Sequence, residues 1–472
     1  MVGYERETLA RLPLAEAAYR LLDYVTHEEF LHEVFAHYRG RSYTKIIDFP
    51  LLVHLIADAL LEHQGSGHKS FRKARGAGLL TTSLKAAYAK LARLPLGLSQ
   101  GFLAEASQRL HEVCPPVDAV ALPPSLAGMT VLVVDGKKIK HVAHRLKCLR
   151  GVRGQVLSAK VAVALHMRTG LAVALSAHPD GEAGDAPLVP DLLAQTRART
   201  GGPRLWVEDR LYCDLQQPRL AQEGGDHYLI RYSAKVSFEQ DLARPARVGQ
   251  DDEGRSYREE WGWLGGAGNP RGHYVRRITL YRPHDQDDVI LVTDLLESDC
   301  YPAVDLLLVY RHRWGIENVF QRITEVFHLR TLIGGSPQAG VFQAAFCLLL
   351  YNVISVLRAY ISQAQQRSPE TISTGNLFYD VHRDLVALHE VLSVPELLKL
   401  FDERLPDQDL RRHLGSLLAE QWSPCWLKAP TKKCPSPTKK HTEYLKGGHC
   451  SVYRLLKKAP KLKPKPAPSA RQ

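Results

Sequence analysis

The stretch LLLVYRHRWGIENVFQRI, residues 306–323, carries the most information about the fold of this chain. Tyr310, Arg313 and Glu317 follow one another at spacings of three and four residues, so a helix would carry all three on one side. A carboxylate buried there needs a positive partner. That partner is either Arg313, in an ordinary helical ion pair, or a metal ion shared with other carboxylates. Taken alone, the segment favours the ion pair.

Two upstream aspartates lie where strands are expected to end. The apolar, β-branched run TVLVV at 130–134 predicts a buried strand that leads into Asp135. A second, shorter strand over 204–208 leads into Asp209. Successive strand side chains point to opposite faces, so only one of Glu208 and Asp209 can join a shared site, and we select Asp209. A single aspartate at a strand end usually just begins a turn, but an Asp, Asp, Glu series on two strands and a helix favours a metal site.

With these residues, the chain resembles the DDE transposases of bacterial insertion sequences, specifically the insertion-sequence-four family. The matching stretches lie within about residues 128 to 358 and are VLVVDGKKIK (131–140), LWVEDRLYCD (205–214), VILVTDLL (289–296) and YRHRWGIENVF (310–320). The family's helix signature is Tyr, two residues, Arg, three residues, Glu, six residues, Lys. Tyr310, Arg313 and Glu317 match this signature. Position 324 is Thr, and the nearest basic residue, Arg322, lies roughly 200° around the helix from it.

The resemblance implies an RNase H-like α/β catalytic core that cuts and joins DNA with Mg²⁺. Two divalent ions about 4 Å apart can activate an attacking oxygen and stabilise the leaving 3′ oxygen. By analogy with the family, Asp135 would bridge both ions, Asp209 would hold one and Glu317 the other. Mn²⁺ is expected to substitute for Mg²⁺.

The resemblance also implies DNA contacts near the cleaved bond. Arg313 would neutralise a phosphate and Tyr310 would hydrogen-bond an adjacent one, with Arg322 as the basic residue nearest to the missing Lys. The family stacks an aromatic residue of an inserted β subdomain on a flipped base, which makes Trp261 and Trp263 candidates. The two tryptophans share a strand face, and we expect at least one of them to pack in the core of the insert.

The first 125 residues are expected to form a helical domain, and the family resemblance implies that this domain binds DNA. Apolar spacing predicts helices over 14–24, 28–38, 51–63, 82–94 and 98–113. Between the third and fourth of these helices, a glycine-flanked basic segment is predicted to be a loop. Its Lys69, Arg72 and Lys73 are the expected phosphate contacts, with an ordinary solvated loop as the alternative.

The rest of the chain divides at the following predicted boundaries. The core would occupy 126–232 and 301–366, the inserted β subdomain 233–300, a helical C-terminal region 367–424 and a basic, disordered tail 425–472. Core strands are expected at 130–135, 159–166, 171–176, 204–208 and 227–232, and insert strands at 256–264, 273–282 and 289–295. The apolar run 344–357 is too short to cross a bilayer, so we expect a core helix and no membrane partner.

The charge of the chain indicates a partner that carries phosphates. Its cysteine content indicates a reducing compartment. The chain has 472 residues and a net charge of +12, and residues 428–472 hold 11 Lys and 2 Arg against one Glu, which accounts for the whole excess. This tail either binds nucleic-acid phosphates without sequence specificity or keeps the protein soluble. Eight cysteines without paired spacing and a charged N-terminus without signal-peptide character indicate a reducing cytoplasm. The family resemblance implies a bacterial cytoplasm and association with the nucleoid.

The sequence therefore predicts a cut-and-paste transposase that acts as a homodimer on double-stranded DNA, both the element ends and the target. A hairpin intermediate is expected from family analogy alone. Two alternatives stay open: a catalytically inactive, transposase-derived DNA-binding protein, which Thr324 favours, and a structure-selective nuclease of the same fold.

Overall fold

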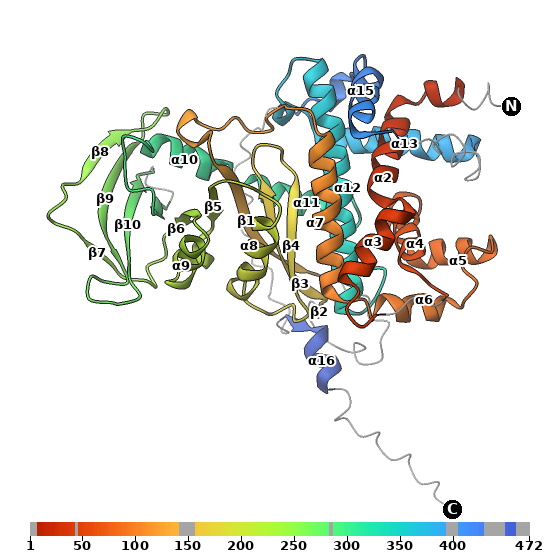
Figure 1. Cartoon of the computed structure of the whole chain (residues 1–472), viewed down its shortest axis with the longest axis horizontal. Helices are drawn as coiled ribbons and strands as arrows, with labels where there is room; N and C mark the ends of the chain where they lie inside the picture. The colour runs from red at the N-terminus through yellow and green to blue at the C-terminus, as the bar shows by residue number, and fades with distance from the viewer. Residues whose placement is uncertain are drawn as a thin grey trace, which may run out of the picture.

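A long mixed sheet organises the molecule (Figure 1). The computed structural model describes residues 7–42, 46–140, 156–282, 287–392, 405–428 and 449–458. The sheet has 10 strands in the order β4-β3-β1-β5-β6-β11-β10-β9-β7, with β8 paired to β9. Its strands are β1 Thr130–Ile139, β3 Ala159–His166, β4 Ala172–His178, β5 Arg204–Glu208, β6 His227–Arg231, β7 Phe238–Gln240, β8 Arg247–Gln250, β9 Ser256–Leu264, β10 His273–Leu280 and β11 Val289–Thr293.

The central part of the sheet has the arrangement expected of an RNase H-like core. β1, β3 and β4 pair antiparallel, as the apolar runs around the Arg168-Thr169-Gly170 turn predict, and β5 and β6 then add in parallel beside β1. Parallel pairing requires crossover connections, which are supplied by α8 (Val189–Arg197) and α9 (Gln216–Glu223). The mixed α/β architecture is thus consistent with the predicted fold class.

Helices cover both faces of the sheet because its central strands are apolar on both sides. Along β1, Val131 and Val133 join one hydrophobic cluster, and Leu132 and Val134 join the other. α8 and α9 cover the second face. The first face is covered by α7 (Leu96–Val113), α11 (Gly315–Glu325) and α12 (Pro337–Ala364). α10 (Ala303–His312) precedes α11.

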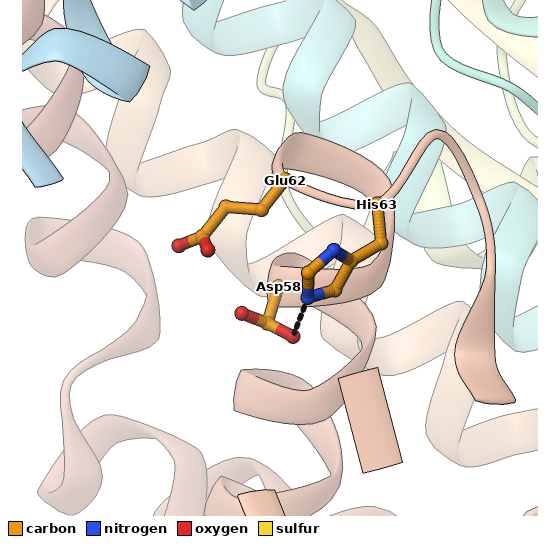
Figure 2. A group of neighbouring side chains, drawn as sticks. All are labelled: Asp58, Glu62 and His63. Atoms are coloured by element: carbon orange, nitrogen blue, oxygen red, sulfur yellow. Dashed lines mark ion pairs between the residues drawn. The ribbon is translucent and has the colours of Figure 1, made fainter. Parts of the chain in front are cut away.

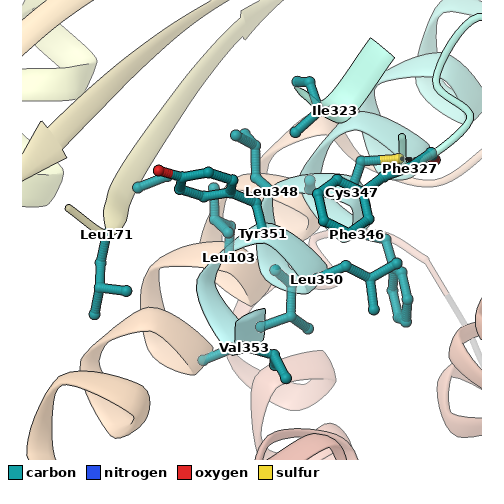
Figure 3. Close-up of a cluster of buried hydrophobic side chains, with 14 of the residues drawn as sticks. Leu103, Leu171, Ile323, Phe327, Phe346, Cys347, Leu348, Leu350, Tyr351 and Val353 are labelled. Carbon is teal, nitrogen blue, oxygen red and sulfur yellow. Dashed lines mark hydrogen bonds between the residues drawn. The ribbon is translucent and has the colours of Figure 1, made fainter. Parts of the chain in front are cut away.

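The helix α12 is the core helix that the apolar run predicts. It is longer than that run, and by length and composition it would pass as a membrane span, but its most apolar window is entirely buried inside the protein. Figure 3 shows its side chains packed against Leu103 of α7 and Ile323 of α11. The Asn352 amide is satisfied by the Ala172 backbone and the Ser107 hydroxyl, so one polar residue ties α12 to β4 and α7.

The N-terminal region is helical, with one correction to the prediction. The helices are α2 Pro13–Thr26, α3 Glu28–Tyr38, α4 Phe49–Leu61, α5 Gly67–Gly76, α6 Leu84–Leu91 and α7. The predicted loop around Lys69 is the helix α5. The Ser66 hydroxyl accepts from the Lys69 amide as an N-cap, and the apolar side of the helix buries Phe71 and Ala74. The helix was not predicted because it is short and because the flanking glycines are typical of a loop.

The hydrophobic core runs without a break from the N-terminal helices to the sheet. α2 packs against α13 (Thr374–Val391) and α15 (Asp407–Leu418), and α7 packs against both α12 and β4. A single cluster of buried side chains includes Leu21 of α2, Leu388 of α13 and Val163 of β3. The predicted domain boundaries stay predictions.

The predicted insert continues the core sheet. β11 pairs antiparallel with β6 and carries β10, β9 and β7 beyond it, at the left of Figure 1. The three expected strands are present, at 256–264, 273–280 and 289–293. The structure adds β7 and β8, which are short and polar and gave no alternating signal.

Part of the predicted disordered tail is ordered, which corrects that prediction for its described residues. Cys450–Ser451 (β12) pairs with Val156–Leu157 (β2), and α16 (Val452–Lys458) follows. Val452 is fully buried, and Arg454 pairs with Asp180 at 2.7 Å and with Glu182. These few contacts compensate for the low apolar content of the segment. Residues 429–448 and 459–472 lie outside the described part of the chain.

Candidate active site at the ends of β1 and β5

Strand register brings the two predicted aspartates together. β1 and β5 are parallel, and their last paired residues are Val134 and Glu208, so Asp135 and Asp209 come next on neighbouring strands. Val133 and Val207 belong to the same buried cluster, and alternation puts the side chains two residues further on the same face of the sheet. This face is the one that α11 covers.

Glu208 points to the other face, where it is fully buried beside the second cluster. Burial raises the pKa of Glu208 to about 8, and the Asp214 carboxylate adds to the rise. The side chain is therefore held as a neutral acid at pH 7 and lies apart from the face that carries Asp135 and Asp209. Asp209 is half-buried and stands directly before the short helix Arg210–Tyr212, to which its side chain makes no capping hydrogen bond.

The acidic helix differs from the prediction in one respect. Tyr310, Arg313 and Glu317 do not lie on one uninterrupted helix, because α10 ends at His312 and α11 begins at Gly315. Arg313 and Trp314 nevertheless keep right-handed helical dihedrals. The i to i+4 relation therefore survives the interruption, and the Arg313 Nη2 atom donates to Glu317 Oε1 at 3.1 Å.

The Arg313 guanidinium lies at the centre of the acidic residues. Its side chain is 4% exposed, and its Nη1 atom is 3.8 Å from Asp135 Oδ2. The Tyr310 hydroxyl donates to Asp209 Oδ1 at 3.4 Å. The expected Asp, Asp, Glu series thus converges around one guanidinium and one phenol, and the ion pair that the helix spacing predicted is also present.

The acidic residues offer the donors that Mg²⁺ takes, which are carboxylate oxygens. Burial raises the pKa of Asp135 to about 6, and the Glu317 and Asp185 carboxylates add to the rise against the opposing effect of Arg313. A site with this excess of negative charge fits a divalent cation. The oxygens of Asp135, Asp209 and Glu317 are not all within 4.8 Å of one another, because Arg313 lies among them.

A glycine makes room for a second ion pair behind Asp135. A Cβ atom on Gly136 would lie 1.7 Å from Asp185 Oδ1, so any larger residue at this position would have to displace the Asp185 carboxylate. Asp185 pairs with the buried Lys160 of β3 at 2.6 Å. Sequence reasoning missed both residues, and the Asp-Gly dipeptide was the only signal for this close approach.

A cavity of about 250 Å³ reaches Tyr310 and Arg313 but not Asp135, Asp209 or Glu317. Its lining includes Arg231 and Trp314 together with the acidic residues Asp251, Asp252 and Glu253. The β5–β6 register pairs Glu208 with Ile230, so Arg231 follows as the neighbour of Asp209. The Trp314 side chain is 59% exposed. Sequence reasoning missed Arg231 and Trp314, which became candidates only through strand register and exposure.

The two tryptophans of the insert are not equally accessible. Trp261 is buried, its indole N–H donates to the Leu296 carbonyl at 3.0 Å, and Arg244 lies over its ring. The prediction that Trp261 could stack on a flipped base is therefore wrong, because the residue packs in the core instead. Trp263 is half-buried and meets Tyr274 edge to face, with 5.0 Å between the ring centroids.

Arg322 lies against the first turn of α13, where a Cβ atom on Gly375 would be 3.1 Å from its Nη1 atom. Its side chain is half-buried and is directed toward the C-terminal helices. Thr324 donates its hydroxyl to the Phe320 carbonyl at 2.6 Å. Neither residue contacts Asp135, Asp209 or Glu317, and the phosphate-binding role of Arg322 stays a prediction.

The basic residues of α5 fall into two classes. Lys69 and Arg72 are exposed on the helix surface. Lys73 pairs with Asp58 at 3.3 Å and with Glu62, so its charge is already balanced. Together with His63, which is 3.4 Å from Asp58, these carboxylates form the one group with metal-binding proximity among the described residues (Figure 2). The Lys73 ammonium supplies the positive charge that a metal ion would otherwise bring to this group.

A comparison with known families agrees with the site. A large mixed sheet that delivers acidic residues to the ends of its central strands, opposite an acidic helix, is consistent with a nuclease of the RNase H-like class. Residues 126–353 match the family model of the transposase DDE domain. This match supports a DDE transposase, which is a transposase-type nuclease; proteins of this kind bind DNA. No curated protein matches the chain. DDE transposases use divalent metal ions.

Proposed function

We propose that the protein is a cut-and-paste transposase of the insertion-sequence-four family that cuts and rejoins the ends of its own element. The observation that supports this proposal most is the convergence of Asp135, Asp209 and Glu317 around the buried Arg313. The family match covers all three carboxylates.

In this proposal the carboxylates hold metal ions at the sheet edge. Asp135, on the central strand, would contribute to both ions, with Asp209 and Glu317 contributing to one each. Two Mg²⁺ ions, for which Mn²⁺ can substitute, would supply activation of the attacking oxygen and stabilisation of the leaving 3′ oxygen. The Lys160–Asp185 pair and Gly136 would fix the backbone under Asp135 from the opposite face.

DNA would approach the acidic residues past Tyr310 and Arg313, which also line a neighbouring cavity. Tyr310, Arg313 and Arg231 line it and would donate to phosphates next to the cleaved bond. Arg313 is neutralised by Asp135 and Glu317 in the absence of DNA. Its guanidinium would turn to a phosphate when those carboxylates are occupied by cations. The exposed residues Lys69 and Arg72 on α5 would add contacts to the terminal repeats, with Trp263 as the accessible tryptophan of the insert.

The reaction as a whole has two DNA ends, and we therefore propose a homodimer that holds both. The freed 3′ hydroxyl of one strand would attack the opposite strand to form a hairpin, and later attack on target DNA would insert the element. The protein would act in the bacterial cytoplasm on nucleoid DNA.

A plasmid that carries the genomic DNA flanking both sides of the coding region tests the proposal. Wild-type protein with Mg²⁺ is expected to cut at the element ends. Asp135→Asn and Glu317→Gln should each lower the rate by more than the roughly 10- to 100-fold cost of losing an outer-shell partner. Glu223→Gln, an exposed acidic residue in a surface ion pair with Arg219 on α9, is the control and should cut at the wild-type rate.

The products separate the open alternatives. Fragments with sealed ends on a denaturing gel would support the hairpin, and ends that separate into single strands would refute it. Binding of the flanking DNA without any cutting would indicate a non-catalytic DNA-binding protein. Cutting at DNA junctions irrespective of the flanking sequence would indicate a structure-selective nuclease.

A further inference from the structure

Helix α11 has no cation two turns beyond Glu317, at position 324. Position 324 is a threonine, and its hydroxyl donates back to the Phe320 carbonyl at 2.6 Å, within its own helix. A threonine bound in this way offers no charge to a phosphate and no free donor. The surface of α11 beyond Glu317 therefore has no basic group at this position.

Strand β1 supplies an ammonium at the same place. Lys137 follows Asp135 by two residues and so projects from the same face of β1, the face covered by α11. Its Nζ atom lies 5.3 Å from the centroid of the Phe320 ring. Phe320 is three residues beyond Glu317 and four before Thr324, so Lys137 lies over the turn between them.

The charge of Lys137 is not balanced at close range. The side chain is half-buried, and no described residue forms an ion pair or hydrogen bond with its ammonium. Asp135 and Glu325 attract it only from beyond ion-pairing distance, and Lys140 repels it. Two other lysines described above differ from it in having carboxylate partners: Lys160 pairs with Asp185, and Lys73 pairs with Asp58.

A half-buried, unpaired ammonium is unfavourable unless an anion binds next to it and balances its charge. The cation is two residues from a carboxylate of the proposed active site and over the acidic helix, and the substrate class there is a phosphodiester. We infer that Lys137 binds a DNA phosphate next to the cleaved bond, so that the phosphate-binding lysine of this site comes from the strand and not from the helix. This inference rests on the proposed function.

Methionine replacement isolates the charge of Lys137. Lys137→Met keeps the stem over Phe320 and should lower the rate of end cutting on the flanking-DNA plasmid by about 10- to 100-fold, the range for one charged hydrogen bond. The variant should also bind a duplex from the same flank with a shallower slope of log affinity against log salt concentration. The slope should fall by the amount that one phosphate contact contributes. Lys138→Met removes the same charge from the opposite face of the same strand and should do neither.

Returning the cation distinguishes a phosphate contact from simple packing. Lys137→Arg should retain most activity, and Thr324→Lys should restore cutting to Lys137→Met, because it would bring an ammonium to the same turn from the helix. The inference is overturned by an unchanged Lys137→Met, by an equal loss in Lys138→Met, or by a loss that neither replacement cation restores. If wild-type protein and Asp135→Asn fail alike to cut, the proposed function itself is refuted.

Discussion

At the scale of single residues, the site is governed by how buried charges are balanced. Arg313 has almost no contact with solvent and is compensated by Asp135 and Glu317, so the acidic edge is stable without bound ions. Helix spacing predicted the Arg313–Glu317 pair, and strand alternation predicted that only one of Glu208 and Asp209 could join the site. The Gly136–Asp185 approach could not be predicted, because it depends on a loop that is 49 residues further along the chain and folds back under β1.

Gly136→Ala should destabilise the protein by about 1–3 kcal/mol, because the added methyl group displaces the Asp185 carboxylate from Lys160. Cutting should fall too, since Asp135 is the adjacent residue. Gly128→Ala is the matched control, since a Cβ atom there meets nothing within 4 Å. Denaturant unfolding of the two variants checks the prediction, and equal stabilities would contradict it.

His166 should make the protein sensitive to acid. Burial lowers the pKa of His166 to about 4, and its Nδ1 atom accepts from the Thr169 amide, so the folded state keeps the imidazole neutral. An unfolded histidine titrates near pH 6.5, so the unfolded state takes up a proton first. Stability is therefore complete above about pH 6.5 and falls as the pH drops toward 4.

The substitution His166→Asn keeps an acceptor for Thr169 and removes the titrating group. The loss of melting temperature between pH 6.5 and pH 4.5 should be smaller in this variant than in the wild type. His54→Asn, at an exposed position, is the control. The same acid-induced loss in wild type and His166→Asn would exclude a role for this residue.

At the scale of elements, strong apolar periodicity gave correct strands and helices, and weak or polar elements were missed. β9 was predicted at its observed bounds, and its aromatic residues Tyr257, Trp261 and Trp263 are spaced to lie on one face of the strand. β7 and β8 are short and polar and left no such signal. The interruption between α10 and α11 could not be seen, because helical spacing continues through Arg313 and Trp314.

Trp261 and Trp314 should respond in opposite ways to truncation. Trp261→Ala empties a buried site on β9 and should cost about 3–5 kcal/mol of stability. Trp314→Ala, at an exposed position between α10 and α11, should change stability by no more than about 0.5 kcal/mol. Urea unfolding of both variants tests this, and a stable Trp261→Ala would reopen a surface role for that residue.

At the scale of the whole molecule, positive charge is concentrated in the C-terminal tail while the rest of the chain is near neutral. Composition predicted this asymmetry, but it could not predict that Cys450–Ser451 would pair with β2, because one buried valine and one arginine are enough to hold the segment. Long-range pairing of a short, polar segment leaves no local pattern in a sequence.

Removal of residues 459–472, which follow α16, should weaken binding to random-sequence DNA. The deleted segment holds 3 Lys and 1 Arg, and each lost phosphate contact should reduce the slope of log affinity against log salt by about 0.9. Titrations of a fluorescent duplex at several salt concentrations measure this slope. An unchanged slope with lower solubility would assign the segment a solubilising role instead.

The uninterrupted core from α2 through α12 to the sheet has a practical consequence for anyone who dissects this enzyme. A recombinant fragment that starts at residue 126 would lack α7. The apolar surface of α12 that α7 covers would then be exposed to solvent, which favours aggregation. Exchange of the N-terminal helices with those of a related protein would meet the same obstacle. Altered specificity is more safely sought by changing surface side chains on the intact polypeptide.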